Sequence, residues 1–83
     1  MSERWLKCFI MKGMFSDERA IRLLTKAENP LSFFVPKSMV RGDLDREGAV
    51  KVLVFEREGD TLAILPTDNR SVVPILEENL ASA

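Results

Sequence analysis

Short apolar runs, punctuated by glycine, proline and polar residues, predict that this chain is built from β-strands. The runs occupy residues 5–11, 31–35, 49–57, 61–66 and 71–76. In the clearest of them Val50, Val52 and Val54 recur at every second position, the period at which side chains return to one face of a strand. The last run contains Pro74, which suits an edge strand or a strand end.

Residues 16–27 fit two kinds of element. Ser16, followed by two acidic residues, is typical of a helix N-terminus. Ile21 and Leu23, however, alternate with Arg22 as they would in a strand, which would make residues 26–30 a hairpin loop. We favour the strand because the neighbouring elements are short strands with brief loops. A helix at 16–27 is the alternative.

The strand pattern predicts a mainly β fold in a single domain, residues 1–83. We expect a small five-stranded antiparallel barrel, Src-homology-3-like or oligonucleotide-binding-like, with at most one short helix. If residues 16–27 were helical, the class would instead be α+β. Barrels of this kind serve many unrelated functions, so function has to be argued from particular residues.

The run at 49–57 and the run at 61–66 read as a hairpin with a two-residue turn at Gly59-Asp60. That turn pairs Glu58 with Thr61 and gives the hairpin two faces. Val50, Val52, Val54, Ala63 and Leu65 form one face, and Leu53, Phe55, Leu62 and Ile64 form the other. Both faces are apolar, whereas an antiparallel sheet open to water on one side has a polar outer face.

The second apolar face therefore needs a cover. Either the same chain supplies it, through the segment around 15–24 or the C-terminal tail, or a partner protein or a second copy does. The predicted interface consists of Leu53, Phe55, Leu62 and Ile64, with Phe34 added because neighbouring residues of a strand point to opposite faces.

Charge argues against general attraction to nucleic acid or lipid. The 12 basic and 13 acidic residues give a net charge of −1 and are interspersed. A local basic surface with aromatic rings is the alternative hypothesis, an RNA- or DNA-binding barrel. Its residues would be Trp5, Lys7, Arg19, Arg22 and Lys37.

Candidate chemistry is sparse. The chain has no histidine and one cysteine, which removes the usual general base, the common nucleophile pairs and an ordinary zinc site. Residues 43–48 match the first half of a calcium-binding loop, but Val54 stands where the bidentate glutamate belongs; we interpret them as a polar turn. We expect no enzymatic activity, metal or cofactor.

The single cysteine, Cys8, cannot form an internal disulfide, and its place in an apolar run predicts a buried structural thiol. Small secreted domains usually carry several disulfides, so we expect a cytoplasmic protein. No apolar stretch is long enough for a signal peptide or membrane span. The sequence thus predicts a small binding module that contacts either a partner protein or a second copy of itself.

Overall fold

The computed structural model describes residues 1–81, which form seven strands and two 3-10 turns. The elements are β1 (Ser2–Lys12), β2 (Glu18–Leu24), β3 (Pro30–Pro36), η1 (Lys37–Met39), β4 (Val40–Arg41), β5 (Arg46–Arg57), β6 (Asp60–Ile64), β7 (Val72–Pro74) and η2 (Glu77–Asn79). The mainly β class is confirmed, but the strand count is seven rather than five. Strand β4 is too short to be recognised from a pattern, and β2 lies in the segment that also fitted a helix.

Residues 18–24 form a strand, so the helix alternative for 16–27 is wrong. Strand β2 pairs on both edges, with Ile21 opposite Ile10 of β1 and opposite Phe33 of β3. Two neighbouring strands thus satisfy backbone groups that a helix would have bonded internally. Ile21 and Leu23 are buried and Arg22 is exposed, as strand alternation requires.

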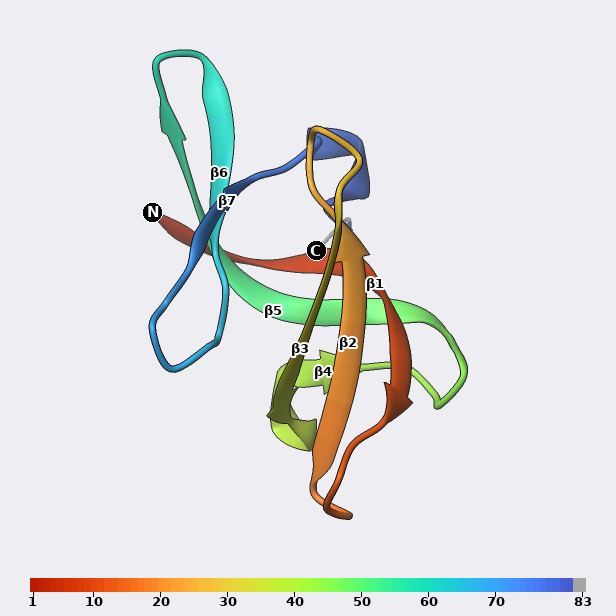
Figure 1. The fold of residues 1–83 in the computed structure, drawn as a ribbon. Helices are drawn as coiled ribbons and strands as arrows, with labels where there is room; N and C mark the ends of the chain where they lie inside the picture. The colour runs from red at the N-terminus through yellow and green to blue at the C-terminus, as the bar shows by residue number, and fades with distance from the viewer. Residues whose placement is uncertain (82–83) are drawn as a thin grey trace.

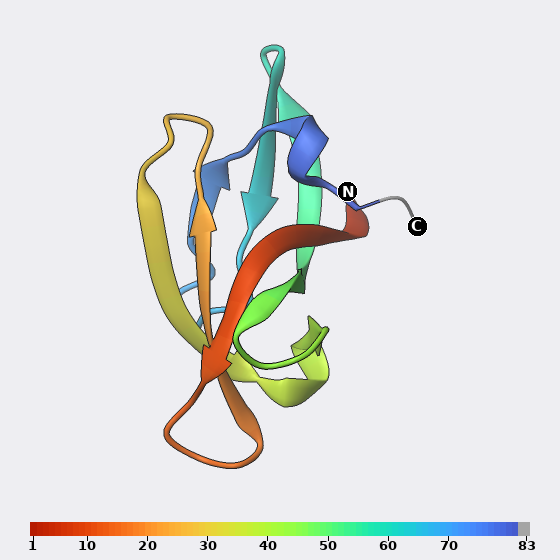
Figure 2. The same cartoon turned by 90° about the vertical axis from the view of Figure 1, so that its right-hand side faces the viewer.

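The strands form one antiparallel sheet in the order β3-β2-β1-β5-β6-β7, and β4 pairs with β5 on the same edge as β6. The sheet curls into a half-barrel (Figures 1 and 2), with the long, bent strands β1 and β5 side by side at its centre. Strands β3 and β7 are the two ends of the sheet.

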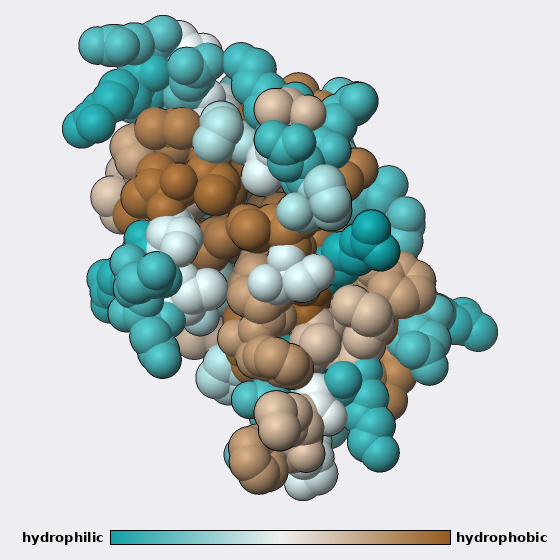
Figure 3. Space-filling model, in the orientation of Figure 1, coloured by the Kyte–Doolittle hydropathy of each residue, from teal (hydrophilic) through white to brown (hydrophobic). Residues whose placement is uncertain are grey.

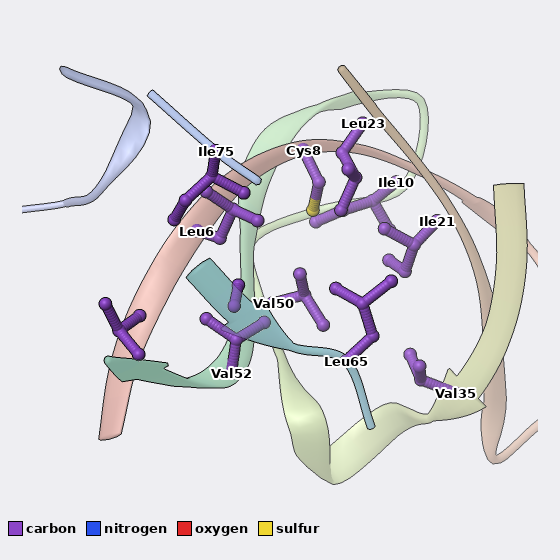
Figure 4. Close-up of a cluster of buried hydrophobic side chains, with 12 residues drawn as sticks. Leu6, Cys8, Ile10, Ile21, Leu23, Val35, Val50, Val52, Leu65 and Ile75 are labelled. Atoms are coloured by element: carbon purple, nitrogen blue, oxygen red, sulfur yellow. The ribbon is translucent and has the colours of Figure 1, made fainter. Parts of the chain in front are cut away.

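The core lies on the concave side of this sheet. Alternate residues of β1, namely Leu6, Cys8 and Ile10, are buried, and so are Val50 and Val52 of β5. Figure 4 shows these side chains pointing toward others from β2, β3 and the ends of β6 and β7. The close agreement with a period of two explains why the strand faces were predictable.

The β5–β6 hairpin has a different register from the predicted one. Its turn is Glu58-Gly59, with φ of 53° and 85°, and Arg57 pairs with Asp60. Two positive φ values are typical of a type I′ turn, whose twist matches that of the flanking strands. The partner of each β5 residue is therefore shifted by two positions. Because an even shift preserves the faces, the predicted division into two faces is confirmed.

The half-barrel is tied together at one end by the β2–β3 loop. The backbone N–H of Lys26 donates to the Pro74 carbonyl at 2.9 Å. The Lys26 ammonium lies 2.9 Å from the Asp60 carboxylate at the hairpin tip. The C-terminal segment adds a second tie, because Leu80 bridges to Leu6 and packs against the core. The Lys26 contacts link the β2–β3 loop to β6 and β7, and the Leu80 bridge links the C-terminal segment to β1.

Candidate binding surfaces

The predicted interface residues Leu53, Phe55, Leu62 and Ile64 lie together on the convex side of the sheet, and we call them the hairpin face. Leu53 pairs with Ile64, and Phe55 pairs with Leu62. All four are half-buried, whereas Val52, Val54 and Ala63 on the opposite side are buried in the core. Cross-strand neighbours at this spacing shield one another, which accounts for part of the burial.

Strand β7 extends the hairpin face. Val72 pairs with Ile64 and is 51% exposed, and Pro74 pairs with Leu62. The side chains that continue the ladder are therefore apolar and open to water. Sequence analysis missed Val72 as a member, although its β-branched side chain beside a polar loop was a usable signal.

One segment of the same chain reaches the hairpin face. Near Leu53 and Ile64, residues 66–68 line a hollow of about 380 Å³. The C-terminal segment lies on the other side of the hairpin, because Glu77 and Leu80 line a hollow of about 320 Å³ with Val54 and Glu56, and Leu80 packs against the core. Within residues 1–81 the C-terminal segment therefore does not cover the hairpin face, and β2 pairs with β1 on the edge away from β5.

Phe34 lies on a different surface from the other four predicted interface residues. It is on β3, at the far end of the sheet order, and its ring is 53% exposed while Phe33 packs against the core. It lines a groove of about 660 Å³, which we call the seam groove. The lining residues are Phe15, Asp17, Glu18, Phe33, Phe34, Val35, Pro36, Pro66, Thr67 and Asp68.

The seam groove and the hollow beside Leu53 adjoin each other. Pro36 and residues 66–68 line both, so the connection after β6 separates the two surfaces. Figure 3 shows the resulting band of apolar surface, which runs from the β5–β6 side at the upper left toward the β1–β2 turn at the bottom. Phe15, in that turn, is 66% exposed and was also missed by sequence analysis.

The residues of the nucleic-acid hypothesis divide into three groups. Lys7 and Arg22 line one hollow together with Phe9 on the convex side of β1 and β2. Lys7 also lies 3.3 Å from the carboxylate of Glu47. Lys7 and Arg22 are therefore the two residues of the predicted set that the fold brings into one hollow.

Trp5 belongs to a separate cluster. The Arg41 guanidinium lies 4.2 Å from the centroid of its ring, and the Lys51 ammonium lies 5.7 Å away. Cations at these distances are attracted to the ring face, so the indole is engaged by side chains of its own chain. This leaves less of the ring for stacking on a base.

Arg19 and Lys37 lie beside the β1–β2 turn. The Arg19 guanidinium donates to the carbonyls of Ser16 and Glu18 at 3.1 and 3.0 Å. The backbone N–H of Lys37 donates to the Asp17 carbonyl at 2.7 Å. Both cations therefore sit by the β1–β2 turn, away from the hollow that Lys7 and Arg22 line.

Cys8 is a buried thiol, as predicted, and is 3% exposed. Burial raises its pKa from 9.0 to about 12, because the thiolate would lose its hydration in the apolar core. The unfolded chain then loses this proton at lower pH than the folded one, so stability from Cys8 is complete below pH 9.0 and falls as pH rises toward 12.

We expect the free energy of unfolding to fall by about 1.4 kcal/mol per pH unit through Cys8 in that interval. Urea denaturation at about pH 8 and about pH 10 measures the loss. The Cys8→Ala variant should lack this part of the slope. An equal slope in both proteins would contradict the prediction.

Three findings bear on other classes of function. Within residues 1–81, no three Asp, Glu or Cys side chains lie close enough to share a metal ion. Residues 43–45 form the turn that leads into β5, where the Asp45 N–H donates to the Ile10 carbonyl at 2.7 Å. In the same part of the chain, no helix has the length and apolar character needed to cross a membrane.

Comparison with known proteins identifies no relative of this chain. No protein-family model, curated protein or solved structure matches the chain. The functional argument therefore depends on the surfaces described above.

Proposed function

We propose that this protein is a small non-enzymatic binding module that acts through protein–protein contact, and that a second copy of the chain occupies the hairpin face. The observation that carries the proposal is the apolar ladder across β5, β6 and β7. Its cross-strand pairs, Leu53 with Ile64 and Phe55 with Leu62, continue to Val72, which is 51% exposed. An apolar sheet face is stable in water when another layer covers it.

Charge around the hairpin face favours a second copy as that layer. A two-fold contact brings the same patch together from both sides, so the patch must complement itself. The rim carries both signs, because the Lys51 ammonium lies 3.8 Å from the Glu3 carboxylate. The net charge of −1 also gives little repulsion between copies. A polyanion such as nucleic acid would meet Glu3 at the same rim.

The expected association is weak. A stable interface buries about 800 Å² on each partner, which is more than a few half-buried side chains can supply. The rim must contribute, and rim charges add little affinity. We therefore expect a dimer that dissociates in the range of about 10 μM.

Sedimentation equilibrium over about a hundredfold range of concentration tests the proposal. The natural chain should shift from monomer to dimer, and Phe55→Glu should remain monomeric, because a carboxylate in the contact is desolvated without a partner. Val72→Glu should do the same, and its exposed position avoids any loss of folding. Leu24→Glu, equally exposed at 51% but on β2, is the matched control and should dimerise like the natural chain.

A natural chain that stays monomeric throughout would refute self-association through this face. Dimerisation that survives both Phe55→Glu and Val72→Glu would show that another surface forms the contact. Circular dichroism of each variant separates a lost contact from a lost fold.

A further inference from the structure

The seam groove lies where the curled sheet stays open. Strands β3 and β7 end the sheet on either side, and residues 66–68, in the connection between β6 and β7, approach the second half of β3 across the groove. The β1–β2 turn at residues 15–18 closes one end, where the Glu18 N–H donates to the Phe15 carbonyl at 3.1 Å. The groove is thus a channel with one strand edge along its length.

The walls of the seam groove carry large apolar side chains that are not part of the core. Phe34 is 53% exposed and Phe15 is 66% exposed. Phe33 forms part of the inner wall, because it packs against the core and also lines the groove. Exposed aromatic side chains gathered at a groove are typical of an interaction site.

The polar lining of the groove is acidic. Asp17, Glu18 and Asp68 contribute carboxylates, and among the described residues that line the groove there is no lysine or arginine. The nearby Arg19 guanidinium donates to two backbone carbonyls of the β1–β2 turn, so it is held against its own backbone. Carboxylates beside aromatic faces favour a guanidinium or ammonium group and repel phosphate.

Strand β3 offers the groove a short backbone edge. Among residues 1–81 it pairs with β2 alone, so every second N–H and C=O points away from β2. Pro30 and Pro36 stand at its two ends, and proline blocks a ladder from extending. The edge can therefore accept a short added strand and resists long, unspecific pairing.

We propose that the seam groove binds an extended peptide segment of a partner protein, in which arginine or lysine alternates with apolar residues. The segment adds to the free edge of β3 as a short strand. Alternation sends its apolar side chains onto Phe34, on the outer face of β3, and its cations to the other face, toward Asp17 and Asp68. This surface is separate from the hairpin face, so the proposal does not depend on dimerisation.

The test uses the fluorescein-labelled peptide GVRVRVG and measures anisotropy with the full chain. We expect a Kd of about 100 μM, which rises with salt because the carboxylates are exposed. The acidic peptide GVEVEVG should not bind. A version of GVRVRVG with methylated alternate backbone nitrogens should lose at least about tenfold in affinity, because it cannot complete the strand pairing.

Variants locate the binding site. Asp17→Asn combined with Asp68→Asn should weaken binding of GVRVRVG about tenfold, as two exposed charge pairs are lost. Phe34→Ser should weaken it by a similar factor. Phe9→Ser is the matched control, because Phe9 is 40% exposed on β1 and does not line the groove; it should change the Kd by less than about twofold.

Four outcomes would overturn the proposal. They are no binding of GVRVRVG at about 1 mM, equal binding of GVEVEVG, unchanged binding by the double Asn variant, and NMR shift changes centred away from β3 and residues 66–68. The monomeric Phe55→Glu variant should still bind the peptide. Failure of dimerisation and failure of peptide binding are therefore seen separately.

Discussion

Gly48→Ala is expected to destabilise the protein by about 3 kcal/mol, a large part of the total stability of a small domain. A Cβ at Gly48 would lie closer than 3.0 Å to the Arg41 carbonyl oxygen and to the Cδ1 atom of Ile10. The Arg41 carbonyl cannot move aside easily, because Arg41 pairs with Ala49 in the β4–β5 ladder. Ile10 cannot move either, since it is 0% exposed in the core. Urea denaturation of the variant measures the loss.

Gly59→Ala separates this steric effect from the general cost of replacing a glycine. Gly59 has a φ of 85° and no heavy atom within 4 Å of an added Cβ. Its replacement should cost about 1 kcal/mol through backbone strain alone. If both variants lost the same free energy of unfolding, the prediction that the close approach of β4 to Gly48 adds a steric penalty would be wrong.

The sequence could predict the hairpin faces but not its register. Side-chain alternation in Val50, Val52 and Val54 depends only on the strand itself. The register depends on which two residues form the turn, and both candidate turns include Gly59. The structure places Glu58 at φ 53°, a conformation that costs energy for a residue other than glycine. A type I′ turn at Glu58-Gly59 and a type II′ turn at Gly59-Asp60 both match the twist of a hairpin, so the local sequence does not select the register.

The contact of β4 with β5 was beyond prediction for a different reason. A two-residue strand has no detectable period, and it forms here because Val40 and Arg41 meet Val50 and Ala49. Gly48 admits this close approach, but a glycine in a polar loop looks the same in a sequence whether or not another strand contacts it. Contacts of this kind are set by the curvature of the whole sheet.

The candidate surfaces were predictable in part. Alternation correctly indicated that one ring of Phe33 and Phe34 points outward. The contribution of Phe15 was hidden because a polar turn surrounds it in the sequence. Gly13 lets that turn fold tightly, since a Cβ there would lie 2.7 Å from the Glu18 carbonyl oxygen. Asp17 and Asp68 come to one groove only through the fold.

Leu23→Ala and Leu24→Ala, the same chemical change at adjacent positions, should have opposite consequences. Leu23 is 3% exposed in the core, so its truncation should cost about 3 kcal/mol through lost burial and a cavity. Leu24 is 51% exposed on the convex side, so its truncation should change stability by less than about 0.5 kcal/mol. Urea denaturation of both variants measures the difference.

The pair also tests the strand at 18–24 directly. In a helix over 16–27, Leu23 and Leu24 would share the apolar face with Ala20, and both truncations would be costly. Similar losses of unfolding free energy in the two variants would therefore support a helix over 16–27 instead of the strand. A larger loss for Leu24→Ala than for Leu23→Ala would instead mean that β2 is shifted by one residue against β1, because a one-residue slip exchanges the two faces of a strand. Only a strand in the observed register, with Ile21 opposite Ile10, predicts that the truncation of Leu23 lowers the free energy of unfolding while the truncation of Leu24 does not.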